Sequence, residues 1–349
     1  MASLHLRVFA TEDPITPQLE SDYQAYFTDV YLENPCRDRN IHSLVYEEDG
    51  KIAGFLGVVP RRMEWMGDSI TAAVATNFAV APESRGMAGL KLTSAFLAGE
   101  HDISIADVAG QNVRRLWEGM GGRSSIIHSV NWLLLLSPAR AILHFLGRRR
   151  GFSSVSRVLR PAASMSDVLA RRLPKGPFLP SKSLLAGEPL DTSLILLHSG
   201  QLLKRFPLRV VYDEQSLAWL LRRAQSLRAR GNIECVMLRT PKGKLAGWYI
   251  YNARPRGIGE VLQVAGEEAA LPEIFSHLCS HAAARGIVGL AGRLERGLLG
   301  PLSQRFCLFN RQATCVLVHS RRSELTSAFL SGDVFFSMLD GEWCLRFKS

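Results

Sequence analysis

Residues 75–93 read A-T-N-F-A-V-A-P-E-S-R-G-M-A-G-L-K-L-T and predict a strand, a short turn and a helix. Residues 75–80 are apolar enough for a buried strand, and Pro82 ends it because proline cannot donate to a β-ladder. Leucine and phenylalanine then recur at helical spacing over residues 90–97. A strand followed directly by a helix is typical of a mixed α/β sheet with crossover helices.

The turn between this strand and this helix combines Arg85 with Gly86 and Gly89. Glycine has no Cβ, so a bound group can approach its backbone closely. A turn that opens a helix also directs several N–H groups and the positive end of the helix dipole to one point. Such a turn can hold a phosphate, but many glycine-containing joints bind nothing. The turn chemistry alone leaves both interpretations open.

The neighbouring segments extend this unit into a mixed α/β sheet. Residues 41–47 and 52–60 form a hairpin, and a second hairpin leads into a strand over 70–80. Alternating apolar residues predict a first strand at 3–10, and residues 126–136 are predicted as the last strand of the unit.

Downstream, a strand over 102–108 precedes a helix over 111–122 that contains Asn112. This order of elements resembles the GNAT acyltransferase superfamily, whose coenzyme A loop reads Arg/Gln-x-x-Gly-x-Gly/Ala after a strand. Arg85 takes the first position of that motif, while Ala88 and Leu90 stand where the family has its small residues. The resemblance covers roughly residues 3 to 137 and rests on the order of elements more than on one motif.

The resemblance implies a donor site for acetyl-CoA or another acyl-CoA. In the family, the strand before the loop splays away from its neighbour and pairs with the pantetheine arm, and the loop holds the pyrophosphate. Asn112 matches the family's pantetheine contact, although its place after Gly110 also suits a helix N-cap. The residues expected to bind the coenzyme are Phe78, Ala79, Val80, Arg85, Gly86, Met87, Ala88, Gly89 and Asn112.

The catalytic groups are less well marked. Trp117 stands where the family has a tyrosine that protonates the leaving thiolate, and an indole N–H cannot do this at neutral pH. Glu64 and His128 are the candidates for the general base. A surface carboxylate on a hairpin and a hydrogen-bonded core histidine are the alternative interpretations of these two residues.

The second part of the chain repeats the order of helix, hairpin, strand, helix and strand, and a last strand over 314–319 and a helix over 324–330 follow. Its loop lacks the Arg-x-x-Gly motif, and two acids at 267 and 268 would repel a pyrophosphate. We therefore expect an α/β fold with two tandem acyl-CoA N-acyltransferase-like domains, the second without a coenzyme site. The expected boundaries are 1–137 for the first domain, 138–190 for a basic helical linker and 191–349 for the second domain.

The net charge of +10 is concentrated in the middle of the chain. Residues 138–230 hold 17 Lys or Arg against 5 Asp or Glu. This excess suits an acidic carrier protein or an anionic surface, or it is a solvated face. Nucleic acid is not expected, because aromatic residues do not alternate with the basic ones.

The cysteines and the most apolar segments indicate in which cellular compartment the protein is expected. The six cysteines form no C-x-x-C pair, which indicates reduced thiols in a cytoplasmic protein and no metal site. The N-terminus does not resemble a signal peptide. The most apolar window, 126–146, contains arginine, histidine, asparagine and proline, so no membrane span is expected.

Together these features predict an N-acyltransferase that moves an acyl group, acetyl in the first instance, from coenzyme A to a small-molecule or peptide amine. An inactive binding or scaffold protein with the same fold is the alternative. An aminoacyl transferase that uses charged tRNA is a third reading, because tandem GNAT units also serve that reaction.

Overall fold

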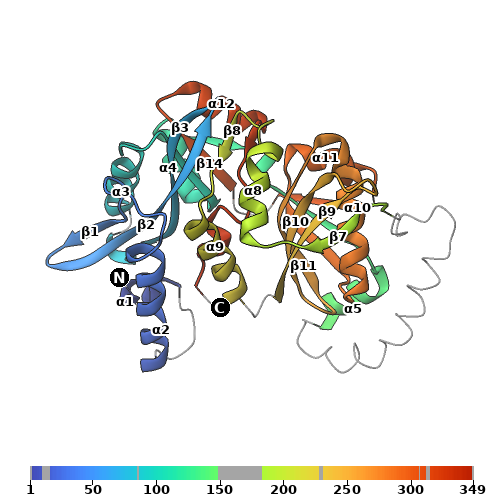
Figure 1. The fold of residues 1–349 in the computed structure, drawn as a ribbon. Helices are drawn as coiled ribbons and strands as arrows, with labels where there is room; N and C mark the ends of the chain where they lie inside the picture. Colours follow the sequence, from blue (N-terminus) through green and yellow to red (C-terminus); the bar gives the residue numbers. More distant parts are fainter. Residues whose placement is uncertain are drawn as a thin grey trace. The chain divides into compact units, whose positions relative to one another are not determined.

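The chain forms two compact units, each built around its own mixed sheet. The first unit comprises Met1–Ser129, Lys204–Ala224 and Gln312–Ser349, and the second Val130–Leu203 and Gln225–Arg311. The units are therefore interleaved along the sequence, unlike the contiguous division at 137 and 191 expected above. The computed structural model describes residues 2–9, 16–84, 86–147, 183–227, 231–305, 307–311 and 315–347 (Figure 1).

The sheet of the first unit is organised around one long hairpin. β2 (Lys51–Trp65) and β3 (Asp68–Val80) pair antiparallel, and β4 (Ile103–Ala109) runs parallel to β3. The antiparallel pairing runs from Trp65–Asp68 to Gly54–Val80. In the described residues the strand order is β15 (Val334–Phe335), β8 (Leu208–Val210), β2 (Lys51–Trp65), β3 (Asp68–Val80), β4 (Ile103–Ala109), β14 (Cys315–His319) and β5 (Arg123–Ser125), with β1 (Leu44–Glu48) also paired to β2.

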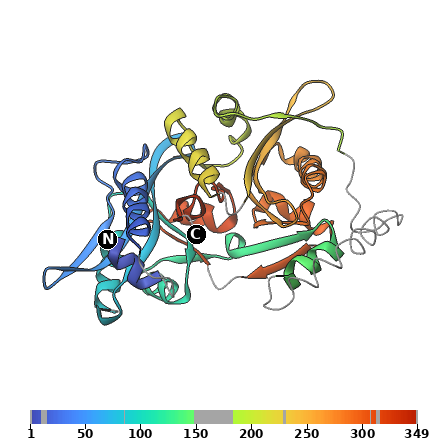
Figure 2. The same cartoon turned by 90° about the horizontal axis from the view of Figure 1, so that it is seen from below.

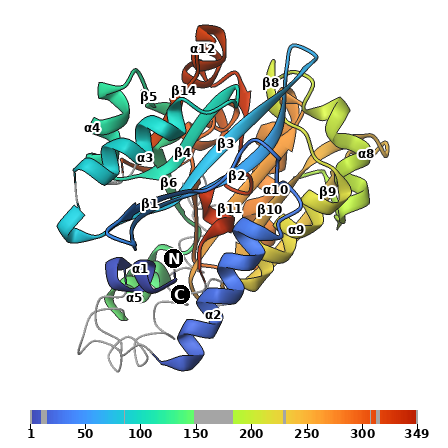
Figure 3. The same ribbon diagram turned by 90° about the vertical axis from the view of Figure 1, so that its left-hand side faces the viewer.

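Helices pack against this sheet. Ala73 and Ala75 of β3 lie in a core with Phe96 of α3 (Met87–Leu97) and Trp117 of α4 (Gln111–Gly119) (Figure 3). The helix α1 (Ala2–Phe9) contacts β2 and β3, and η1 (Thr28–Leu32) contacts β2. The helical segments of the unit are α1 (Ala2–Phe9), α2 (Pro17–Phe27), the π-helical η1 (Thr28–Leu32), η2 (Pro82–Ser84), α3 (Met87–Leu97), α4 (Gln111–Gly119), η3 (Ile127–Ser129), α9 (Glu214–Ser226), α12 (Ser323–Ser331) and η7 (Glu342–Leu345).

The second unit has the same kind of sheet. Its strand order is β13 (Cys307–Arg311), β6 (Val130–Leu135), β12 (Gly289–Arg293), β11 (Ile258–Gly266), β10 (Leu245–Ala253), β9 (Asn232–Arg239) and β7 (Ala186–Pro189). The helical segments among its described residues are α5 (Pro138–Gly147), α8 (Thr192–Leu202), η5 (Glu268–Ala270), α10 (Leu271–Ala284), η6 (Arg296–Leu298) and α11 (Leu299–Ser303).

The sequence predicts a strand over residues 3–10, but residues 3–9 lie in the helix α1, and residue 10 is outside the described residues. Leu4, His5 and Leu6 are all buried, whereas a strand on one face of a sheet would bury every second residue. Over so short a segment alternation does not distinguish the two structures, and packing against β3 decides it.

Two strands lie in a different sheet from the one predicted for them. β6, expected to close the first sheet, pairs with β12 and β13 in the second, where the Trp132 indole donates to the Arg293 carbonyl at 3.0 Å. Gly292 accepts this packing because any side chain there would meet the Trp132 ring. β14, expected in the second copy, pairs with β4 and β5. Strand partners are set by tertiary contacts that a local pattern does not contain.

Candidate functional site

β3 and β4 are paired over only part of their length. Their parallel register runs from Ala72–Ile103 to Val74–Ile105 and then stops. Beyond that point β3 stays paired with β2 as far as Val80, and β4 stays paired with β14 as far as Ala109. Residues 75–80 of β3 and 106–109 of β4 therefore face each other without ladder hydrogen bonds. We call this stretch the β3–β4 opening.

A bulge in β3 marks this opening. The register with β2 shifts between the pairs Gly57–Thr76 and Phe55–Ala79, so β3 carries one extra residue there. Asn77 lies in the bulge with φ of 48°, a left-handed conformation that asparagine tolerates better than most residues. A bulge of this kind bends its strand and redirects the backbone, which accounts for the early end of the pairing with β4.

Helix α3 begins at the end of β3. Its N-cap, Gly86, has φ of 101° and ψ of −77°, a conformation that strongly favours glycine. The first intrahelical bond runs from the Leu90 N–H to the Gly86 carbonyl at 2.9 Å. The N–H groups of Met87, Ala88 and Gly89 precede this bond, so they have no acceptor within the helix. The α3 N-terminus thus presents donors and a positive dipole end beside the opening.

Most residues predicted to bind the coenzyme lie in this one region. Phe78, Ala79 and Val80 form the free edge of β3, and Gly86, Met87, Ala88 and Gly89 form the start of α3. Arg85 lies outside the described residues. Asn112 is exposed in the first turn of α4, directly after β4, and the N-cap of that helix is Gly110. The N-cap interpretation of Asn112 is therefore wrong.

The helix η7, in the red C-terminal segment beside the label C of Figure 2, contacts both β3 and β4. The Glu342 N–H donates to Asp107 Oδ1 of β4 at 2.8 Å. Its Oε1 accepts from the Thr76 hydroxyl at 3.2 Å and from the Asn77 N–H at 3.3 Å, both on β3. Glu342 thus links the two strands where their ladder ends. Sequence reasoning missed it, because nothing in residues 335–347 points to a site.

The pKa of Glu342 is raised to about 7. Burial, which penalises the charged form, is the main cause, and the negative charge of Asp107 adds to it. Arg346 opposes the shift. The side chain remains partly exposed, and Oε2 makes no hydrogen bond within the described part of the chain.

Several contacts hold this C-terminal segment, residues 337–347, in place. Asp340 accepts hydrogen bonds from Ser337 and Tyr212, and its carbonyl accepts from Arg61 Nε at 2.9 Å. The Phe347 ring stacks on Tyr23 with centroids 3.8 Å apart. The further contacts are Tyr26 Oη to the Leu345 carbonyl and Arg223 Nη2 to the Arg346 carbonyl.

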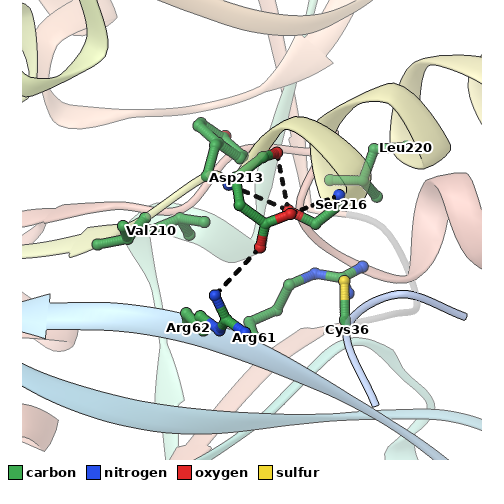
Figure 4. Close-up of a pocket in the computed structure, with 9 residues that line it drawn as sticks. Cys36, Arg61, Arg62, Val210, Asp213, Ser216 and Leu220 are labelled. Carbon is green, nitrogen blue, oxygen red and sulfur yellow. Dashed lines mark hydrogen bonds and ion pairs between the residues drawn. The ribbon is translucent and has the colours of Figure 1, made fainter. Parts of the chain in front are cut away.

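A small pocket lies beside this segment, between β2 and the start of α9 (Figure 4). Its volume of about 20 Å³ suits a guest the size of a water molecule. Arg61 and Cys36 point toward each other there, and Arg62 forms an ion pair with Asp213 at 3.3 Å. Arg61 is 2% exposed. Its Nη2 has no hydrogen-bond partner among the described residues.

Neither predicted base lies at the opening. Glu64 is on β2 and forms an ion pair with Arg209 of β8. The partner of Val80 on β2 is Gly54, so Glu64 is ten residues away along the strand, or roughly 30 Å. The ion pair between Glu64 and Arg209 links the neighbouring strands β2 and β8, which is a structural role.

His128 lies in η3, next to the edge strand β5. Its Nδ1 is 2.8 Å from the Ser125 hydroxyl, and its ring packs against Phe329 at 4.9 Å. Since β14 separates β5 from β4, His128 is far from the edge of β3. Trp117 is 2% exposed and packs against Phe96, so it too is a core residue.

Comparisons with known proteins bear on the fold. No family model and no curated protein sequence matches the chain. A conserved protein of unknown function from Enterococcus faecalis V583, described as a probable N-acyltransferase, matches 91% of this chain over 69% of its own, with 10% identity and a TM-score of 0.55. A GCN5-related N-acetyltransferase from Anabaena variabilis matches 92% of this chain over 70% of its own, with 14% identity and a TM-score of 0.55.

The fold is the GNAT acyl-CoA N-acyltransferase fold. Because these alignments span both units, the predicted tandem form is confirmed. β11 of the second GNAT-like unit also pairs with β12 only from Ile258 to Val261. The joint after β11, however, carries Glu267, which forms an ion pair with Lys244 at 2.9 Å.

Part of the basic charge in 138–230 is paired inside the protein. Arg209 pairs with Glu64, and Arg223 pairs with Asp29 at 3.3 Å. The densest part, residues 148–182, lies outside the described residues. Within the described ranges no helix is long and apolar enough to cross a membrane, and no group of three or more His, Cys, Asp or Glu side chains is placed to hold a metal ion.

Proposed function

We propose that the protein is an acyl-CoA N-acyltransferase that transfers an acyl group directly from coenzyme A to an amine. The observation that carries this proposal is the β3–β4 opening beside the N-terminus of α3, in a fold shared with an N-acetyltransferase. A free strand edge offers backbone groups to the amides of a pantetheine arm, and a helix N-terminus offers donors to a pyrophosphate.

In this proposal the coenzyme lies along the edge of β3. The pyrophosphate contacts the N–H groups of Met87, Ala88 and Gly89 together with Arg85, and Asn112 contacts the pantetheine arm. The arm runs past Phe78–Val80, so the thioester reaches the neighbourhood of Asn77. Positioning of this kind supplies much of the rate of a direct transfer, because no covalent enzyme intermediate is needed.

The donor site is tested by calorimetry with acetyl-CoA and octanoyl-CoA. Arg85→Glu should weaken binding at least tenfold, since it reverses a charge beside the pyrophosphate. Arg39→Glu, at an exposed position before β1, gives the same change in net charge and should bind as the wild type does. If the Arg85 variant binds acyl-CoA with unchanged affinity, the loop is not part of the donor site. If the wild type does not bind acyl-CoA, the proposal that acyl-CoA is the donor is wrong.

An inactive binding protein of the same fold is the second candidate. Burial of Trp117 in the α3–α4 core favours it, because the tyrosine acid expected at that place is absent. Water can protonate a departing thiolate, which is a fair leaving group without help. Release of coenzyme A thiol in the presence of glycinamide, putrescine and lysine methyl ester separates the candidates: donor binding without thiol release identifies the inactive protein.

The acceptor in this proposal is a small-molecule or peptide amine, and the basic residues of 138–230 attract an acidic carrier or an anionic surface. Electrostatic recruitment weakens with ionic strength. Binding to vesicles of anionic lipid, or to an acidic acyl carrier protein, should therefore fall steeply between 50 and 500 mM salt, and salt-independent binding would contradict it. We place the activity in the cytoplasm, a location supported by six free cysteines.

A further inference from the structure

The two faces of the first sheet have different roles around the β3–β4 opening. Ala73 and Ala75 face the core under α3 and α4. Side chains alternate along a strand, so Thr76 points to the opposite face, where it meets Glu342. Asp107 follows Ala106, which faces the α3–α4 core, and likewise meets the C-terminal segment. The carboxylate of Glu342 is therefore on the far side of the sheet from α3.

This placement puts the Glu342 carboxylate near the point that the thioester of an acyl-CoA bound at α3 would reach. Val80 and Asn77 are three residues apart, a distance of about 10 Å along β3. An arm that enters at α3 and follows this edge arrives at Asn77, whose N–H bonds to Glu342 Oε1. The other oxygen, Oε2, makes no hydrogen bond within the described residues, and the side chain is partly exposed.

We infer that Glu342 is the general base of the transfer, brought into the opening by the C-terminal segment. The inference rests on the proposed acyl-CoA acceptor chemistry. One oxygen anchors the side chain to β3, and the other receives a proton from an amine that approaches on the face opposite α3.

The reaction balances with this single base. The acceptor enters as an ammonium ion, and Glu342 Oε2 takes one proton and passes it to solvent. The freed nitrogen lone pair attacks the thioester carbonyl carbon, so a C–N bond forms. The C–S bond then breaks and its electron pair leaves with sulfur. The second proton lost by nitrogen ends on the coenzyme thiolate, and the products are an amide and free coenzyme A.

The surroundings of Glu342 suit a base that works near neutral pH. Its pKa of about 7 follows from burial and from Asp107 of β4, against the opposing charge of Arg346 in its own segment. Tyr26 of α2 also interacts with it electrostatically. A base whose pKa lies close to the working pH combines a useful deprotonated fraction with proton affinity. Thr76 and Asn77 donate to the anion and restrain the shift.

The first test compares Glu342→Gln with the wild type. The amide oxygen can still accept from Thr76 and Asn77, so the segment should stay docked and acetyl-CoA should bind with unchanged affinity by calorimetry. Thiol release with glycinamide, putrescine or lysine methyl ester should fall by about 100-fold or more. Glu324→Gln, at an exposed carboxylate bonded to Arg322, is the matched control and should keep full activity.

The second test measures the pH profile of kcat/KM. The ionisation of a purely structural glutamate would not appear in this profile. In the wild type, kcat/KM should rise with pH through an ionisation near 7. Asp107→Asn removes the neighbouring charge but keeps an oxygen for the Glu342 N–H, so this ionisation should move to lower pH. A carbon-13 NMR titration of labelled glutamate side chains should show a signal near pH 7 that Glu342→Gln removes.

The outcomes separate the two proposals. If the wild type binds no acyl-CoA, or transfers to none of these amines, the proposed function fails and the base fails with it. If the wild type transfers but Glu342→Gln retains its rate within twofold, or no glutamate titrates near 7, only the assignment of Glu342 is overturned. Loss of acetyl-CoA affinity in Glu342→Gln would indicate a structural role and would also overturn it.

Discussion

At the scale of single residues, Asn77 joins the bulge of β3 to three other segments. Its side-chain amide donates to the Tyr26 hydroxyl and, at 2.6 Å, to the Tyr31 hydroxyl. Its carbonyl oxygen lies 3.3 Å from His5 Nε2. One asparagine therefore satisfies polar groups of α1, α2 and η1 while its own backbone holds the left-handed conformation that opens the ladder.

We expect Asn77→Ala to lower the free energy of unfolding by about 2 kcal/mol or more, because two largely buried tyrosine hydroxyls lose the amide that donates to them. Alanine also tolerates the left-handed conformation less well than asparagine does. Asn40→Ala, at an exposed position, should change the stability little. Urea unfolding of both variants measures the difference, and equal midpoints would contradict this role of Asn77.

Gly341 is a second residue with a precise requirement. A Cβ at this position would overlap the Asp107 carboxylate, with its carboxyl carbon only 2.6 Å away. Gly341→Ala should therefore push the segment off β4 and lower the unfolding free energy by about 1–3 kcal/mol. Gly119→Ala, at the end of α4 with open space around the new Cβ, should be neutral or slightly stabilising. Thermal unfolding of the pair tests this, and a harmless Gly341→Ala would mean that Asp107 can move aside.

At the scale of elements, β3 and α3 were predictable because their signals are local. The apolar run, the proline stop and the helical spacing all lie within residues 75–97. The partners of β6 and β14 were not predictable, since each pairs with strands more than a hundred residues away in sequence or in the other half of the chain. Glu342 was missed for the same reason: its role depends on a β3–β4 contact that its own neighbours do not encode.

The start of α3 yields a prediction at this scale. Gly86→Ala places a side chain at φ of 101°, which should cost about 1–2 kcal/mol and distort the first turn of the helix. Acetyl-CoA affinity should fall with it, because the donors of Met87, Ala88 and Gly89 lose their alignment. Calorimetry and thermal unfolding on the same sample measure both effects. Stability loss with intact affinity would show that the coenzyme does not use this turn.

At the scale of the whole molecule, two partly buried histidines make stability depend on pH. The pKa of His101 and that of His281 are each lowered to about 4, mainly by burial. The unfolded chain takes up these protons near pH 6.5, whereas the folded chain does so only near 4, so the stability they allow above 6.5 is lost as the pH falls through this window.

We therefore expect the urea midpoint to fall between pH 7 and pH 4.5, and to fall less steeply in His281→Gln. Glu342 acts in the opposite direction: its raised pKa favours the folded state at low pH, and that contribution is lost as the pH rises through about 7. Parallel midpoint curves for the wild type and His281→Gln would show that His281 ionises as freely in the folded protein as in the unfolded chain.

The interleaving of the units has a consequence for the order of events during synthesis. β14 completes the first sheet and residues 337–347 complete the opening, yet both follow the second unit in the sequence. Until they leave the ribosome, the edge of β4 has no partner and the proposed site has no carboxylate. The nascent N-terminal part therefore has an unpaired strand edge, exposed to other chains, until the second unit and β14 have been translated.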